Sequence, residues 1–396
     1  MWFNKYVLWG LLAIGFGLWA SPASAACGGT AVHGGTHACY LISGATSWTV
    51  SGAWSNTAGG TSCACTPATT DDVVLDGFTS TATVGNAITV NSLDTNLGGD
   101  AQGAFTGVLT QSATLTIGGD YFYLNAPMTW TQSGTRFVIF TSTTGSSGTP
   151  TQVWPNGVQL GNVNFSGSGG YFELESNLSM NTGSAFAGIA LTLGTLDLTT
   201  HNPNVTGPGM VASAATTINC GSGTFTLTAY SASQAPWTDT ATVSCASAAL
   251  VWTPASTIVT SQTLGTNGAT FSSLTVNGVS GGGEYPYQIT GAATFTNFNI
   301  NSNGFGTRVV LPTGVTYTTT NLTITGTSAA PVSLLSTQGG IFATTLTVTN
   351  SPTISWAGIS GMTFTNAATA NNSFNLGGNT NVTITVPSGG SHIIGG

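Results

Sequence analysis

The chain has 396 residues, of which only 4% are charged, with 3 Lys and Arg residues against 11 Asp and Glu residues and a formal net charge of −8 at pH 7. So few cations argue against nucleic acid and strongly anionic polysaccharide as partners, because binding to polyanions depends on clustered Lys and Arg. The hydrophobic fraction is 41%. Its alternation with polar residues favours a packed core over a disordered chain.

Residues 1–25 are expected to be a secretory signal peptide. Lys5 precedes an apolar run, and Ala23-Ser24-Ala25 forms a small-residue cleavage site. The residues up to Cys27 also fit a lipoprotein signal loosely, which is the alternative. No second apolar stretch approaches the ~20 residues that a membrane helix needs. The sequence therefore predicts an exported protein without a membrane span, either secreted or held at the cell surface.

Residues 26–67 are predicted to form a glycine-rich head stapled by disulfides. An exported protein meets an oxidising compartment, and the 6 cysteines of the chain make three pairs. Cys63 and Cys65 are too close in sequence to favour each other. We expect them to pair with Cys27 and Cys39.

Two groups of side chains in and just after the head offer ligands for a metal ion. Calcium would take carboxylates that follow the head, Asp71, Asp72 and Asp76. Zinc would take nitrogen and sulfur ligands inside it, from His33, His37, Cys27 and Cys39. We expect neither, because the aspartates are placed to cap a turn and end a strand, and exported cysteines oxidise first. The sequence predicts no cofactor, with calcium as the alternative.

Residues 68–396 are predicted to form a single all-β domain, a single-stranded parallel β-helix (β-solenoid) with about 24 residues per coil. Pairs of apolar residues separated by one residue recur every 24 residues. The five pairs are Leu250/Trp252, Leu274/Val276, Phe298/Ile300, Leu322/Ile324 and Leu346/Val348. A fixed period of this size is typical of a solenoid, in which each coil buries its apolar face by stacking on its neighbours.

Further repeats run beside this set. A second column gives each coil at least two strands and contains Val309/Leu311, Val332/Leu334 and Ile354/Trp356. Earlier in the chain the same step is kept by Leu115/Ile117, Ile139 and Val163/Phe165. Asn297 and Asn321 lie one period apart and are predicted to stack as an asparagine ladder. Cys220 and Cys245 are 25 residues apart, about one coil, so we expect them to be bonded.

Motifs at both ends of the predicted solenoid resemble a known group of proteins. The opening motif consists of Trp48, Trp54, Gly59-Gly60, Pro67 and Asp71-Asp72-Val73-Val74. The closing motif consists of Trp356-Ala-Gly-Ile-Ser-Gly and Asn372-Ser373-Phe374-Asn375. Together they resemble the β-helix modules of phage and prophage tail-associated proteins and of some bacterial surface adhesins. The resemblance implies the fold and a structural or surface-binding role, and it implies no catalytic residues.

Two kinds of side chain are candidates for contact with a ligand or substrate. Trp154 and Trp237 each stand beside a proline, which predicts corner loops, and are candidates for stacking on a sugar ring. Glu173 and Glu175 are expected to point outward on one strand, ~6.5 to 7 Å apart, at the lower edge of the inverting glycosidase range. In open solvent neither is kept protonated, so we expect no catalysis.

These observations predict a secreted or surface-exposed structural or adhesive β-solenoid. It would bind a neutral polysaccharide or a cell surface, with self-association as a further option. Two alternatives remain open: a phage-type tail or receptor-binding component, and a carbohydrate-active β-helix enzyme that would use Glu173 and Glu175. The secretory signal favours the adhesive interpretation over the virion, because phage tail proteins usually lack one.

Overall fold

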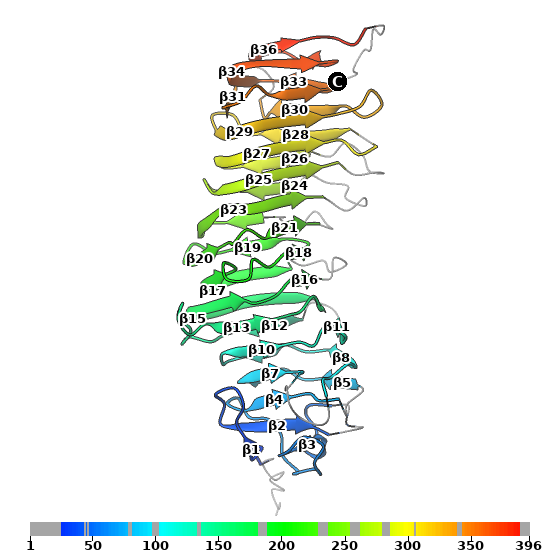
Figure 1. Cartoon of the computed structure of the whole chain (residues 1–396), viewed down its shortest axis with the longest axis vertical. Helices are drawn as coiled ribbons and strands as arrows, with labels where there is room; N and C mark the ends of the chain where they lie inside the picture. Colours follow the sequence, from blue (N-terminus) through cyan, green and yellow to red (C-terminus); the bar gives the residue numbers. More distant parts are fainter. Residues whose placement is uncertain are drawn as a thin grey trace, which may run out of the picture.

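The computed structural model describes residues 25–388, apart from residues 43, 44, 46, 78–80, 97–102, 133–135, 181–187, 229–236, 254–261, 279–285, 305 and 339–342. The predicted signal peptide, except for Ala25, therefore lies outside the described residues. The described part is an all-β solenoid, an elongated stack of strands that runs from β1 (Gly29–Thr30) at one end to β36 (Thr380–Ile384) at the other (Figure 1). Its one helical element is a short 3-10 turn, and no helix among these residues is long and apolar enough to cross a membrane.

Successive coils contribute strands to three parallel ladders, which form three faces of the solenoid. The first ladder contains β2 (His37–Leu41), β4 (Asp72–Val74), β7 (Ser92–Asp94), β10 (Tyr121–Tyr123), β13 (Thr151–Trp154), the ends of β15 (Asn162–Leu174) and β17 (Ile189–Asp197), β20 (Thr216–Asn219), the start of β23 (Thr242–Trp252), and β31 (Thr344–Val348). After β23 this ladder continues with the starts of β25 (Thr270–Asn277), β27 (Ala293–Asn301) and β29 (Thr316–Thr325), then β31, and then the start of β34 (Met362–Asn371).

The second ladder contains β6 (Ile88–Val90), β9 (Leu115–Ile117), β12 (Phe137–Phe140), the starts of β15 and β17, β19 (Met210–Ala212), β22 (Trp237–Asp239), β24 (Gln262–Gly265), β26 (Pro286–Thr290), β28 (Thr307–Leu311), β30 (Val332–Ser336), β33 (Ala357–Ser360) and β35 (Phe374–Asn375).

The third ladder begins as a separate sheet of β5 (Thr81–Val84), β8 (Val108–Gln111) and β11 (Thr129–Gln132). It continues with β14 (Gln159–Leu160), β16 (Leu178–Met180), β18 (Val205–Gly207), β21 (Thr224–Leu227), the end of β23, β25 (Thr270–Asn277), β27 (Ala293–Asn301), β29 (Thr316–Thr325), β32 (Thr353–Ser355), β34 (Met362–Asn371) and β36 (Thr380–Ile384).

The head closes one end of the stack with antiparallel strands. Its elements are β1 (Gly29–Thr30), the 3-10 turn η1 (Ser51–Ala53) and β3 (Trp54–Ser55). Both strands pair antiparallel with β2, and β2 in turn pairs parallel with β4. The head therefore supplies the first rung of the solenoid, so that the polar edge of β4 is not left open.

Alternation along each strand builds the core, as the apolar repeat predicts. Leu250, Leu274, Phe298 and Leu322 pair with one another in successive rungs, and each is at most 2% exposed. The column does not continue through Leu346, which was expected next. Leu346 pairs with a residue in the first ladder, and Ile354 follows Ile324 in the third, because this coil is longer than the repeat.

The second predicted column is displaced in register. Val309 pairs with Leu334 instead of Val332, a shift of two residues that keeps the same side chains inside. Trp356 is not a core residue of this ladder, because it lies half-buried in the turn before β33 with φ at 51°. In the first half of the chain Val138, not Ile139, occupies the inward position of β12.

The asparagine ladder is confirmed on the outer face of the third ladder. Asn297 pairs with Asn321, and Asn321 Nδ2 donates to Asn297 Oδ1 at 2.8 Å. Asn301 Nδ2 donates to Asn277 Oδ1 at 3.1 Å in the neighbouring column. Each rung thus uses the side-chain amide as a donor to the rung before it, which continues the backbone hydrogen bonding in a second layer.

Glycines allow β15 to bend from the second ladder into the first. Gly169 has φ at 74°, a left-handed conformation that other residues rarely adopt. A Cβ atom on Gly170 would lie 2.2 Å from the backbone oxygen of Ser142 on the preceding coil. The bend needs glycine at both positions, and it delivers the segment from Tyr171 to Leu174 to the first ladder.

One of the predicted disulfides is confirmed and the pairing in the head is wrong. Cys220 and Cys245 are bonded, with Cα atoms 4.6 Å apart. In the head, Cys27 is bonded to Cys39 and Cys63 to Cys65. The close pair is allowed because Ala64 between them has φ at 53°, which turns the chain back. The Cα atoms of Cys63 and Cys65 thereby come within 5.2 Å.

The Cys220–Cys245 bond is expected to stabilise the middle of the solenoid. Closing a loop of 25 residues contributes about 3 kcal/mol in the chain-entropy model. Replacing both cysteines with serine should lower the free energy of unfolding by this amount, measured by urea denaturation of the oxidised protein. If peptide mapping of the unreduced wild-type protein finds either cysteine as a free thiol, the assignment of this disulfide is wrong.

Candidate functional site

Three aromatic side chains form a strip on the outer face of the first ladder. Tyr121 and Tyr123 lie on β10 on either side of buried Phe122, and Trp154 follows buried Val153 on β13. Tyr123 pairs directly with Trp154. The ring centroids are 6.3 Å apart between the tyrosines and 6.0 Å apart between Tyr123 and Trp154. We call Tyr121, Tyr123 and Trp154 the aromatic platform.

Two histidines extend the aromatic platform at its ends. His33 comes from the head and stacks on Tyr121 with ring centroids 3.7 Å apart, while its Nε2 lies 2.7 Å from a carboxylate oxygen of Asp94. His201 follows β17, and its ring lies 5.7 Å from that of Trp154. Burial raises the pKa of Tyr121 to about 12, with Asp94 and Tyr123 adding to the shift. The phenol therefore stays neutral.

The aromatic platform borders a shallow pocket of ≈ 400 Å³. The pocket lies at the turns that follow β10, β13 and β15 and is lined by Tyr123, Asn125, Ala126, Asn156, Gly157, Ser176 and Asn177. Asn125 Nδ2 donates to the Phe105 carbonyl at 2.9 Å, and Asn156 Nδ2 donates to the Leu124 carbonyl at 2.7 Å. These bonds hold the amides in place, so a rigid set of neutral polar groups stands beside the half-buried rings of the platform.

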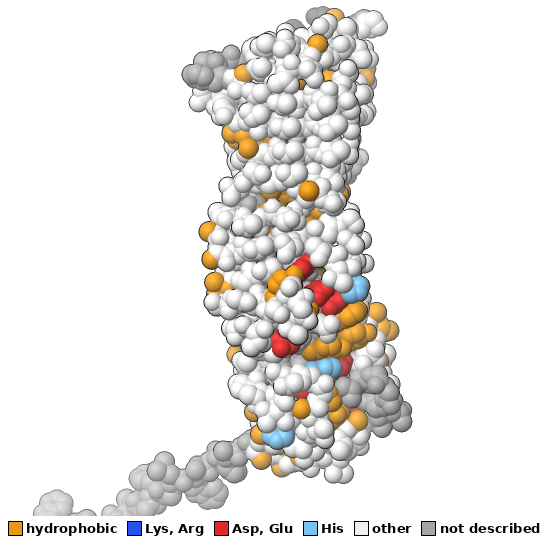
Figure 2. All heavy atoms as spheres, turned by 60° about the vertical axis from the view of Figure 1, so that its left-hand side comes forward, with side chains coloured by type: hydrophobic (Ala, Val, Ile, Leu, Met, Phe, Trp, Pro, Cys, Tyr) orange, Lys and Arg blue, Asp and Glu red, His pale blue; other side chains and the backbone are white. Residues whose placement is uncertain are grey.

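The whole region is visible as a patch on the surface of the N-terminal half of the solenoid. Figure 2 shows hydrophobic side chains gathered there between acidic and histidine side chains. No Lys or Arg side chain is seen among the described residues in this view. The described arginines lie elsewhere, Arg136 before β12 and Arg308 on β28 of the second ladder.

The sequence predicted that both glutamates point into open solvent. The structure corrects this prediction for Glu175. Glu173 is half-buried on β15, but the strand ends at Leu174, and Glu175 lies in the following turn at 5% exposure. Glu175 Oε2 lies 2.6 Å from His201 Nδ1. Burial raises the pKa of Glu175 and the charge of Glu173 raises it further, whereas His201 lowers it.

The predicted separation of the two carboxylates is also corrected. Oxygens of Glu173 and Glu175 and a nitrogen of His201 lie within 4.8 Å of one another. These residues are a donor set that suits a divalent cation. The distance is shorter than the separation at which inverting glycosidases hold a water molecule between two carboxyl groups.

Of the two tryptophans predicted to contact a ligand, only Trp154 is accessible. Trp154 ends β13, is half-buried and precedes the turn at Pro155. Trp237 is 0% exposed, and its ring packs edge-on against Phe225 and Phe271 at 5.3 and 5.5 Å. The prediction for Trp237 is wrong because β22 begins at this residue and the alternation of β22 directs it into the core.

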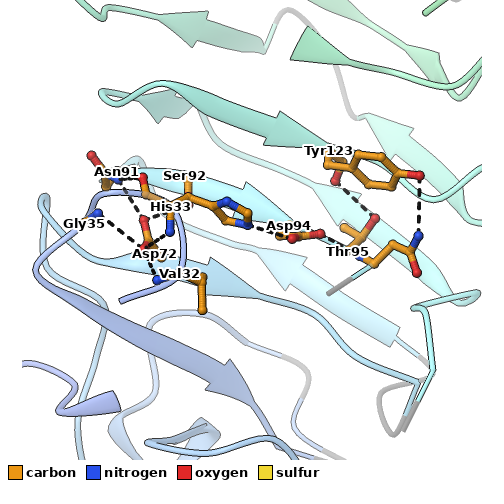
Figure 3. A network of polar contacts seen from close by, with 10 residues as sticks. Val32, His33, Gly35, Asp72, Asn91, Ser92, Asp94, Thr95 and Tyr123 are labelled. Atoms are coloured by element: carbon orange, nitrogen blue, oxygen red, sulfur yellow. Dashed lines mark hydrogen bonds and ion pairs between the residues drawn. The ribbon is translucent and has the colours of Figure 1, made fainter. Parts of the chain in front are cut away.

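The aspartates considered for calcium are buried structural residues. Asp72 accepts hydrogen bonds from Asn91 Nδ2 at 2.7 Å and Ser92 Oγ at 2.8 Å, and from backbone N–H groups of Val32 and His33 at 2.9 and 2.8 Å (Figure 3). Donors on all sides suit an anion and repel a cation.

The remaining metal candidates have structural partners as well. Asp71 Oδ2 accepts the Ala68 N–H at 2.8 Å, which is the turn cap expected from the sequence. Asp76 is 2% exposed and itself forms an isolated antiparallel bridge with Ala104. The zinc alternative loses its sulfur ligands because Cys27 and Cys39 are bonded to each other.

His37, the second histidine considered for zinc, has its Nδ1 3.4 Å from a carboxylate oxygen of Asp71. His33 is likewise engaged, by Asp94 and Tyr121. The histidines of the head therefore serve its attachment to the first coils.

Comparisons with protein-family models, with curated proteins and with solved structures found no match. The function of the site is therefore argued from its geometry.

Proposed function

We propose that this protein is an exported, surface-exposed structural or adhesive solenoid that binds a neutral polysaccharide, free or on a cell surface, without catalysis. The observation that carries the proposal is the aromatic platform beside a pocket with fixed amide side chains. Sugar rings present apolar C–H faces and a rim of hydroxyl groups. Half-buried aromatic rings on the outer face match the faces of the sugars, and amides match the hydroxyls.

The position of the platform supports binding to an extended chain. Tyr121 and Tyr123 are successive outward residues of one strand, and Trp154 continues the strip onto the next rung. Strands in a sheet lie about 4.8 Å apart, so the strip spans more than one sugar ring. A long, rigid solenoid with few charges also presents this strip without the electrostatic attraction that would favour polyanions.

Trp154→Ala is expected to weaken binding to neutral polysaccharide by about tenfold, because removal of the ring loses its stacking and its buried area. Binding is measured by calorimetry with oligomers of N-acetylglucosamine and of β-glucan. Trp356→Ala is the matched control, since Trp356 is also half-buried but lies in the turn before β33. Equal affinity of the two variants for the oligomers would refute the platform as the binding site.

The same preparations test the enzyme alternative. The binding proposal expects no new reducing ends when the wild-type protein is incubated with these oligomers. Turnover that is present in the wild type and absent in Glu173→Gln would replace the adhesive proposal with a glycoside hydrolase.

A further inference from the structure

The aromatic platform lies in a region of acidic side chains whose charged partners, among the described residues, are histidines only. Glu173 pairs with Gln152 on one side and with Asp197 on the other, so carboxylates occupy successive rungs beside Trp154. Glu175 adds a third carboxylate in the adjoining turn. Among the described residues every ion pair joins a carboxylate to a histidine, and no arginine takes part.

The three carboxylates differ in how far their charge is already satisfied. Glu175 contacts His201, and Asp197 accepts hydrogen bonds from the Tyr171 hydroxyl and from the Thr199 N–H at 2.7 Å. Glu173 is the most exposed of the three and is half-buried on its strand. Its charge adds to the cost of ionising buried Glu175. A positive charge from a ligand would therefore be most favourable at Glu173.

The platform and the carboxylate occupy neighbouring positions on one face. Glu173 pairs with Gln152, which lies two residues before Trp154 on the same face of β13. A step of two residues along a strand and one strand across places two such positions roughly 8 Å apart. An ammonium group at this point donates a charge-assisted hydrogen bond to a carboxylate. It also gains the attraction of a cation to the faces of Trp and Tyr rings.

We infer that the polysaccharide bound at the aromatic platform contains amino sugars with free amine groups, with one ring stacked on Trp154 and its ammonium group directed to Glu173. The inference rests on the proposed function but changes one property of its ligand, since the otherwise neutral polysaccharide now carries protonated amine groups. Neutral rings fill the remainder of the platform and the pocket, where the lining side chains carry no charge. An acidic sugar at the same position is repelled by Glu173, Glu175 and Asp197.

The test compares glucosamine oligomers with N-acetylglucosamine oligomers of equal length by calorimetry. The measurement is made at about pH 6, where an amine of ordinary pKa is protonated, and at low salt. Wild-type protein is expected to bind the glucosamine oligomer about tenfold more tightly, as for one hydrogen bond between charged groups. Raising the salt concentration to about 0.15 M should reduce this preference, because the Debye screening length then shortens to about 8 Å.

Variants separate the charge from the stacking. Glu173→Gln should bind both oligomers equally while keeping the wild-type affinity for the acetylated one, and Trp154→Ala should weaken both. Asp120→Asn is the matched control. It removes the same charge from the turn before β10, where Asp120 accepts a hydrogen bond from Ser142 Oγ at 2.6 Å. This control should keep the preference for the free amine.

The outcomes distinguish failure of the inference from failure of the proposed function. Equal affinity of the wild-type protein for the two oligomers, or a preference that survives Glu173→Gln, overturns the amino-sugar assignment and leaves the platform as a neutral-glycan site. Failure to bind either oligomer overturns both. Glu173 lies at the surface, so an unchanged thermal midpoint for Glu173→Gln confirms that the variant is folded.

Discussion

Phe298→Asp is expected to unfold several coils of the solenoid together. Phe298 is 0% exposed and is stacked between Leu274 and Leu322 in the third ladder. Loss of the ring and burial of an unpaired carboxylate together cost about 5 kcal/mol or more. Each coil is stabilised by its neighbours, so the damage extends to the rungs on both sides. Circular dichroism should show a lower thermal midpoint or loss of strand signal.

Thr275→Asp is the matched control for Phe298→Asp. Thr275 lies on the neighbouring strand, faces outward and is half-buried beside Asn299, whose Nδ2 donates to Thr275 Oγ1 at 3.4 Å. A solvated aspartate at this place should change the free energy of unfolding by about 1 kcal/mol or less. If both substitutions lower the thermal midpoint equally, the inward and outward assignment of these strands is wrong.

The period of the solenoid could be predicted because three coils in a row have no insertion. Leu274, Phe298 and Leu322 are spaced by the repeat, and their strands pair residue for residue. The prediction fails at Leu346, where a longer coil shifts the register to Ile354. Alternation identifies which residues share a face, but insertions at corners decide which rungs they occupy. Three strands per coil likewise became evident only from the pairing of the strands.

The candidate site could be predicted only in part. Tyr121-Phe122-Tyr123 signals two outward aromatic rings by alternation, and this signal was missed. Their contact with Trp154 depends on the register of β10 and β13, which are further apart in sequence than the repeat. His33 and His201 come from the head and from a turn, segments without periodicity, so no pattern could place them. Glu175 was misplaced for a related reason, because the strand ends one residue before it.

The pairing of cysteines shows the same limit. Sequence spacing placed Cys220 and Cys245 on adjacent coils because both lie within the repeat. In the head the chain path depends on the left-handed backbone conformation of Ala64. An alanine in the sequence does not indicate this conformation. Asp72 on β4, considered as a calcium ligand, proves to be a buried anchor for the head.

Asp72→Asn is expected to release the head from the first coils. Asp72 is 0% exposed and accepts hydrogen bonds from both the head and the solenoid, through Val32 and His33 on one side and Asn91 and Ser92 on the other (Figure 3). Asparagine loses the negative charge and turns an NH2 group toward N–H donors. The loss should be about 3 kcal/mol or more. Hydrogen exchange should show reduced protection of β2.

The stability that Asp72 supplies should also depend on pH in a defined direction. Burial alone would raise the pKa of Asp72, but hydrogen bonds from His33, Asn91, Val32 and Ser92 outweigh it and hold the pKa below 3.8. A lowered carboxyl pKa stabilises the folded protein above 3.8 and loses this effect as the pH falls through the folded value. Urea denaturation at pH 7 and in acid should therefore show a larger loss of unfolding free energy for the wild type than for Asp72→Asn.

Asp120→Asn is the control, because it removes a carboxylate outside the head. This variant should keep the acid dependence of the wild type. The same dependence in Asp72→Asn would show that another group anchors the head.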